Sequence, residues 1–133
     1  MQERIFIIGD IEMGRGDIMD DFKDDDIFVD FMEKIGHKSN ESNAKTTLVL
    51  NGDIFDFLKM GYKDNYPRYI TEDISRWKLD QIIQHHPKIF AALKKFVHHP
   101  HNHVYFVIGN HDADMVWPAL QNMTTEVLQS KKD

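Results

Sequence analysis

The chain has 133 residues, of which 41% are hydrophobic and 29% charged, a composition typical of one globular domain spanning residues 1–133. It has no cysteine, which excludes disulfide scaffolds, thiolate zinc sites and cysteine nucleophiles. It also has no apolar run of the about 18 residues that a membrane span needs. The N-terminus lacks the pattern of a secretory signal, so we expect a cytoplasmic protein.

The formal net charge of −6 is unevenly distributed. Residues 1–60 hold 14 acidic and 7 basic side chains, whereas residues 61–133 hold 8 acidic and 9 basic ones. This balance argues against a broad nucleic-acid-binding face, which needs a basic surface. Seven of the eight histidines lie from His85 onward. An acidic first half and a histidine-rich second half suggest metal ligation, provided that the residues converge.

In chain order, the pattern predicts a strand at residues 4–8, a helix at 25–35, a strand at 46–50, helices at 75–85 and 87–97, a strand at 103–108 and a short helical tail. The strands are nearly continuous apolar runs, typical of parallel strands buried on both faces. The first helix carries one apolar stripe and is expected to end at Gly36. The stripe consists of Ile27, Phe28, Phe31, Met32 and Ile35. The order β-α-β-αα-β predicts an α/β fold with a parallel sheet.

A glycine and polar side chains follow each predicted strand. The three segments are Gly9-Asp10-Ile-Glu12, Gly52-Asp53-Ile-Phe-Asp56 and Gly109-Asn110-His111-Asp112. Ligands of open α/β sheets bind beyond the carboxyl ends of the strands, where parallel strands bring such segments together. Asp10, Glu12, Asp53 and Asn110 offer hard oxygen donors suited to divalent cations. A single aspartate at such a position more often caps a helix, but three strand ends together favour a metal site.

These segments resemble the motifs of the calcineurin-like metallophosphoesterases, in which Asp-x-His, Gly-Asp-x-x-Asp and Gly-Asn-His-Asp/Glu follow successive strands. The second and third match fully, and the resemblance spans Ile5 to about Trp117, closest to bacterial members. It implies that the parallel-stranded β-α-β-αα-β core is the first half of a four-layer α/β/β/α sandwich. The chain is then expected to be a single, incomplete catalytic domain.

The resemblance also implies a chemistry, the hydrolysis of a phosphomonoester or phosphodiester by water that two divalent metal ions (Mn, Fe/Zn or Mg) activate. Asp53 would bridge the two ions, Asp10 would bind the first and Asn110 the second. His111 would donate a proton to the leaving group, and Asp56 would orient it. The expected substrate is a phosphorylated small molecule, a nucleotide or a lipid-linked phosphate.

Two departures from the family pattern leave alternatives open. Glu12 replaces a ligating histidine; it either binds a hard cation or inactivates the site. The family also has histidines after the third motif, including a Gly-His-x-His segment, and this chain has none after His111. The alternative function is therefore a truncated or degenerate non-catalytic copy that acts as a binding or interaction module.

Three further expectations concern the surroundings of the site. Arg15, in the loop after the first strand, is expected to contact the substrate phosphate. The histidines at residues 85–86 and 98–103 are expected to be capping or surface residues rather than metal ligands. Three parallel strands with about three helices would leave one face of the sheet uncovered, which predicts self-association or marginal stability.

Overall fold

The computed structural model describes residues 2–63 and 65–129, without the side chains of residues 38–42. Three strands, β1 (Glu3–Ile8), β2 (Lys45–Asn51) and β3 (Asn102–Val107), form one parallel sheet in the order β1-β2-β3. Their register places Ile7 beside Val49 and Val49 beside Tyr105. The parallel sheet predicted from the apolar runs is confirmed. Residues 1 and 130–133 of the predicted domain lie outside the described residues.

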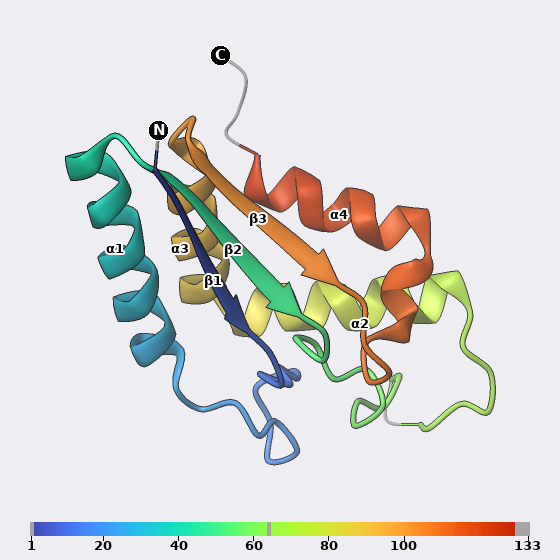
Figure 1. The fold of residues 1–133 in the computed structure, drawn as a ribbon. Coiled ribbons are helices and arrows are strands. Elements are labelled where there is room, and N and C mark those ends of the chain that lie inside the picture. Colours follow the sequence, from blue (N-terminus) through green and yellow to red (C-terminus); the bar gives the residue numbers. More distant parts are fainter. Residues whose placement is uncertain (1, 64, 130–133) are drawn as a thin grey trace.

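Helices connect and follow the strands as predicted (Figure 1). They are α1 (Asp25–Ser42), α2 (Glu72–His85), α3 (Pro87–His98) and α4 (Pro118–Leu128), with a short 3-10 helix at Ala113–Val116. The Thr71 hydroxyl caps α2 by accepting a hydrogen bond of 3.3 Å from the backbone N–H of Ile74. Pro87 and Pro118 occupy the first turns of α3 and α4, where a missing N–H costs nothing. In the described residues, no helix is both long and apolar enough to cross a membrane.

The extent of α1 differs from the prediction. The helix passes through Gly36 and continues to Ser42, and Asn43 follows it in the left-handed conformation with φ 48°. Gly36 lies opposite the Phe96 ring of α3, within the contact between the two helices rather than at the end of a helix. Ile27, predicted in the apolar stripe, is 68% exposed because it lies in the first turn outside that contact.

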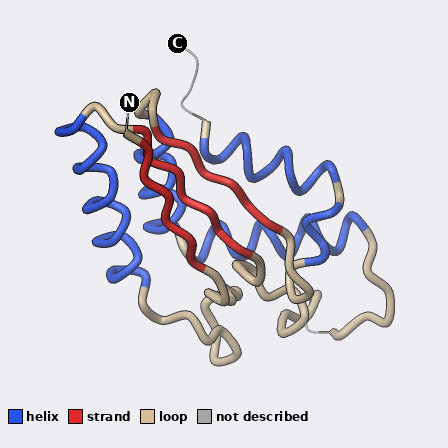
Figure 2. Tube along the Cα trace, in the orientation of Figure 1, coloured by secondary structure: helices blue, strands red, loops and turns tan. Residues whose placement is uncertain are grey.

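The helices cover one face of the sheet (Figure 2). The covered face contributes Leu48 and Leu50, which are fully buried in the core. On the opposite face Ile5, Ile7 and Tyr105 are more than half exposed. The expectation of strands buried on both faces is therefore wrong for β1 and β3, whereas in β2 no residue from Lys45 to Leu50 is exposed. The expectation of one uncovered face is confirmed for the described residues. Alternation of exposure along β1 and β3 is the pattern of a sheet covered on one side only.

Candidate functional site

The segments that follow the three strands meet at one edge of the sheet, as predicted. The backbone N–H of Glu12 donates to the Asp53 carbonyl at 2.8 Å, and that of Asp10 donates to the Gly52 carbonyl at 3.3 Å. The backbone N–H of Phe57 donates to the His111 carbonyl at 3.2 Å. Pairing between the chain segments thus continues beyond the strands and fixes these loops against one another.

Three of the predicted metal ligands have left-handed backbone conformations. The φ angles are 53° at Asp10, 55° at Glu12 and 53° at Asp53. A non-glycine residue in this region costs about 1 kcal/mol or more, and such strain gathers at functional sites where the side chain must point in one direction. The same backbone feature at the ends of β1 and β2 supports a common purpose for these carboxylates.

The carboxylate of Asp53 joins the second and third segments. Its Oδ1 accepts a hydrogen bond of 2.9 Å from the backbone N–H of His111. The Asn110 side chain, with its amide nitrogen turned toward Asp53, donates to Oδ2 at 3.1 Å. Two of the predicted ligands, Asp53 and Asn110, are therefore brought together. Gly109 makes this possible, because a Cβ there would lie 2.4 Å from Asp53 Oδ1.

Asp112, the last residue of the third motif, organises the same loops and was given no role in the sequence analysis. Its side chain is buried and accepts hydrogen bonds from the backbone N–H groups of Gly109 at 2.7 Å and Ile54 at 2.9 Å. These hydrogen bonds tie the second and third segments to one another through a single buried side chain. Its position at the end of the matching tetrapeptide is the sequence signal that could have identified it.

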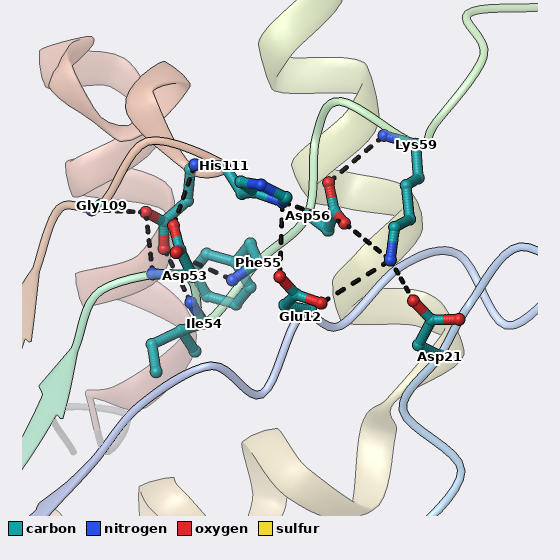
Figure 3. A network of polar contacts seen from close by, with 10 residues as sticks. Glu12, Asp21, Asp53, Ile54, Phe55, Asp56, Lys59, Gly109 and His111 are labelled. Atoms are coloured by element: carbon teal, nitrogen blue, oxygen red, sulfur yellow. Dashed lines mark hydrogen bonds and ion pairs between the residues drawn. The ribbon is translucent and has the colours of Figure 1, made fainter.

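A metal-capable group forms from Glu12, Asp56 and His111, whose ligand atoms all lie within 4.8 Å of one another (Figure 3). His111 Nδ1 is 3.3 Å from Asp56 Oδ2 and 3.4 Å from Glu12 Oε1. The predicted contact between Asp56 and His111 is thus present. The nearby carboxylate of Asp56, aided by those of Asp53 and Glu12, raises the pKa of His111 above its ordinary value.

Two atoms of this group lack the hydrogen bonds that their burial demands. Asp56 Oδ2 and His111 Nδ1 are buried, and within the described residues neither meets a donor or acceptor with hydrogen-bond geometry. The side chain of Asp56 is only 1% exposed. A buried polar atom without a partner is costly, and a cation is one way to satisfy a carboxylate oxygen. The residues present therefore fit a divalent cation.

Lys59 is part of the group and was missed by the sequence analysis. Its Nζ lies 3.3 Å from Asp56 Oδ2 and 3.6 Å from Glu12 Oε2, and it forms an ion pair with Asp21. The backbone N–H of Lys59 donates to Asp56 Oδ1 at 3.3 Å. The sequence signal for Lys59 was its position three residues after Asp56, because a turn of the backbone can bring two side chains at that spacing together.

Buried polar contacts from α2 support the segment around Asp56. Lys78 Nζ donates to the Phe57 carbonyl at 3.0 Å, and burial lowers the pKa of this lysine. Ser75 Oγ donates to Asp114 Oδ2 at 2.5 Å. The first contact fixes the segment after Asp56 to α2, and the second fixes the 3-10 helix that follows the third motif to the same helix.

The remaining predicted residues lie around this group. Asp10 and Asn110 are exposed at the edge of the sheet. Arg15 is paired with Asp17, its Nε at 2.8 Å from Asp17 Oδ2. Of the clustered histidines, expected to be capping or surface residues, His86 does occupy the cap position between α2 and α3, but it is buried, at 3% exposed, rather than on the surface. Its ring is held between the carboxylates of Asp20 and Asp25, which come from a distant part of the chain.

Comparison with known families agrees with this geometry. A family model described as calcineurin-like phosphoesterase matches residues 3–131. The chain belongs to this family, a class of metal-dependent phosphoesterases, and the resemblance drawn from the three motifs is confirmed. The three-stranded parallel sheet with its helices is consistent with the first half of the family's fold. Neither the curated proteins nor the solved structures gave a match. The bacterial type stays a prediction.

Proposed function

We propose that this chain hydrolyses a phosphomonoester or phosphodiester with water activated by two divalent cations. The convergence of Glu12, Asp56 and His111 at the carboxyl ends of the strands is the observation that carries this proposal. The unsatisfied Asp56 Oδ2 and the family membership support it. We propose a phosphorylated small molecule, a nucleotide or a lipid-linked phosphate as the substrate class.

The residues that would hold the cations are Asp10, Glu12, Asp53 and Asn110. Glu12 belongs both to this set and to the group with Asp56 and His111. When bound, the cations lower the pKa of a water molecule and neutralise charge on the phosphate. All four residues offer oxygen atoms, which favours a hard cation such as Mn²⁺ or Mg²⁺ over one that prefers nitrogen.

His111 would hold the proton that the leaving oxygen receives. Its Nδ1 side is turned toward Asp56 and Glu12, which leaves Nε2 to face the substrate. The raised pKa of His111 keeps the ring protonated to a higher pH, the state that a general acid needs. Asp56 would orient the ring and stabilise its positive charge.

Turnover of a mono-aryl and a bis-aryl phosphate in the presence of Mn²⁺ tests the proposal. We expect Asp53→Asn and His111→Ala each to lower kcat by about 10²-fold or more, the usual contribution of such groups. Asp30→Asn, which removes an exposed carboxylate paired with Lys34, is the matched control and should leave turnover unchanged. Equal turnover in the wild type and both site variants would refute catalysis by this chain. It would favour the alternative, a non-catalytic copy that acts as a binding or interaction module.

The role of Glu12 is tested by Glu12→His, which restores the residue found in the family. If glutamate limits the site, this variant should hydrolyse the same substrates faster than the wild type. If Glu12 is itself a suitable ligand, the change should lower the affinity for Mn²⁺ or Mg²⁺, since imidazole prefers softer cations.

We also propose that the uncovered face of the sheet mediates self-association. The exposed apolar side chains of Ile5, Ile7 and Tyr105 lie on that face, and parallel sheets are usually covered on both sides. Sedimentation velocity should show a concentration-dependent larger species that Ile7→Lys removes. A wild type that stays monomeric at every concentration would contradict this proposal.

A further inference from the structure

We propose that Lys59 is a built-in cation of the site: its ammonium holds Glu12 and Asp56 together in the metal-free protein and must leave them when a divalent cation binds. Lys59 would thereby set the metal affinity of the chain as a positioning residue. This inference rests on the proposed metal-dependent function and adds a determinant of metal binding to it.

The geometry places the ammonium between Glu12, a proposed metal ligand, and Asp56, the carboxylate that would orient His111. Lys59 Nζ is 3.3 Å from Asp56 Oδ2 and 3.6 Å from Glu12 Oε2 (Figure 3). Both carboxylates belong to the metal-capable group, whereas the third partner of Lys59, Asp21, does not. The side chains of Glu12 and Lys59 are 28% and 31% exposed, so the ammonium is within reach of solvent and can move.

The repulsion between Glu12 and Asp56 explains why the metal-free protein needs another cation beside these two carboxylates. Glu12 and Asp56 present two carboxylates on the same side of His111, and like charges at this distance repel each other. Asp56 is nearly fully buried and cannot be screened by water. A lysine ammonium is charged at neutral pH and supplies the counter-charge.

The ammonium and a metal ion would compete for Glu12, which belongs both to the proposed ligands and to the metal-capable group. A cation such as Mg²⁺ binds carboxylate oxygens at about 2.1 Å and would repel an ammonium held beside those oxygens. Asp21 offers Lys59 a partner outside the metal-capable group, with a side chain that is 63% exposed. Metal binding should therefore shift Lys59 from three carboxylates to Asp21 alone, and the stability of that remaining pair should help metal binding.

Mn²⁺ affinity measured by calorimetry on chelator-treated protein tests the inference. We expect Lys59→Met to bind Mn²⁺ about tenfold more tightly, because one positive charge beside the ligands is removed. The same variant should unfold at a lower temperature than the wild type when no metal is present. Lys45→Met is the matched control; Lys45 pairs with Glu3 at 3.3 Å at the opposite end of the sheet, and the control should leave Mn²⁺ affinity unchanged.

A second variant decides the question if Lys59→Met does not fold. Asp21→Asn changes an exposed side chain and leaves Lys59 with only Glu12 and Asp56 as partners, so it should weaken Mn²⁺ binding several-fold. Equal Mn²⁺ affinity in the wild type and in the folded variants would overturn the inference. Tighter binding by Lys59→Met together with equal turnover of the wild type and Asp53→Asn would overturn the proposed function and leave the inference standing.

Discussion

The buried ring of His86 gives the sharpest prediction for the stability of the loop that carries Asp10 and Glu12. His86 Nε2 lies 2.6 Å from Asp20 Oδ2, and Nδ1 lies 2.9 Å from Asp25 Oδ1. His86 follows the end of α2, Asp20 belongs to the loop after β1, and Asp25 begins α1. One ring therefore connects three parts of the chain that meet behind the site.

Asp20 depends on His86 more than Asp25 does, because the side chain of Asp20 is fully buried and cannot be hydrated instead. It also accepts hydrogen bonds from the backbone N–H groups of Gly16 at 2.8 Å and Phe22 at 3.0 Å. Burial by itself would raise the pKa of Asp20, but the hydrogen bonds from the Gly14 backbone, His86 and these two amides outweigh it and lower the pKa. The carboxylate is thus stable in its charged form only with its partners in place.

His86→Ala should lower the free energy of unfolding by about 3 kcal/mol. A hydrogen bond to a charged group contributes about 1.5–3 kcal/mol, and we expect the upper end because the loss of the ring removes a partner from the carboxylates of both Asp20 and Asp25. The loss should be measured by urea denaturation at pH 7, followed by circular dichroism. His85→Ala is the control, since the neighbouring His85 is exposed and its Nδ1 lies 2.7 Å from the Gln81 carbonyl oxygen of its own helix.

A double-mutant cycle with Asp20→Asn separates the pair from the loss of packing. We expect a coupling energy of about 1–3 kcal/mol between His86 and Asp20, the range for residues within one polar network. If His86→Ala costs no more than His85→Ala, or if the coupling energy is near zero, the reasoning that this ring holds the loop is refuted.

Three further predictions concern the same loops. Asp112→Asn should lower the free energy of unfolding by about 2–3 kcal/mol in urea, because an amide cannot accept all the backbone hydrogen bonds that Asp112 now receives; an unchanged midpoint would contradict this. Gly109→Ala should lower Tm by several degrees in calorimetry, since the added Cβ would meet Asp53, and an unchanged Tm would argue against the close approach. Because folding lowers the pKa of Asp20 below its unfolded value of 3.8, the charged side chain contributes its full stabilisation above pH 3.8. This contribution is lost as the pH falls through the pKa of the folded state. The wild type should therefore be more stable than Asp20→Asn at neutral pH, and this difference in the free energy of unfolding should disappear in strong acid.

The sheet and the helix order could be predicted because their signals are local. A run such as Thr46–Leu50 is apolar and β-branched, and Pro87 marks a helix start, whatever the rest of the chain does. The end of α1 could not be predicted, because Gly36 has the local signal of a helix end, yet the helix continues to Ser42 and Asn43 takes the left-handed conformation after it. The helix packs against α3, and such a tertiary contact can override a local signal.

The candidate site was likewise predicted only in part. Asp53, Asp56 and His111 were predicted because each follows a strand, and parallel strands place their ends at one edge. Lys59 and His86 were not predicted, since their partners Asp21 and Asp20 lie 38 and 66 residues away along the chain. Such pairs depend on the path of the loops, which no local pattern encodes. The native metal and the cytoplasmic location stay predictions.

The proposed phosphoesterase activity depends on bound divalent cations, and removal of the metal tests this dependence most directly. The rate of hydrolysis of the aryl phosphates should be measured after chelation and dialysis, and again after titration with Mn²⁺. We expect the metal-free protein to be inactive and the rate of hydrolysis to return in proportion to the Mn²⁺ bound. An equal rate with and without bound metal would contradict it.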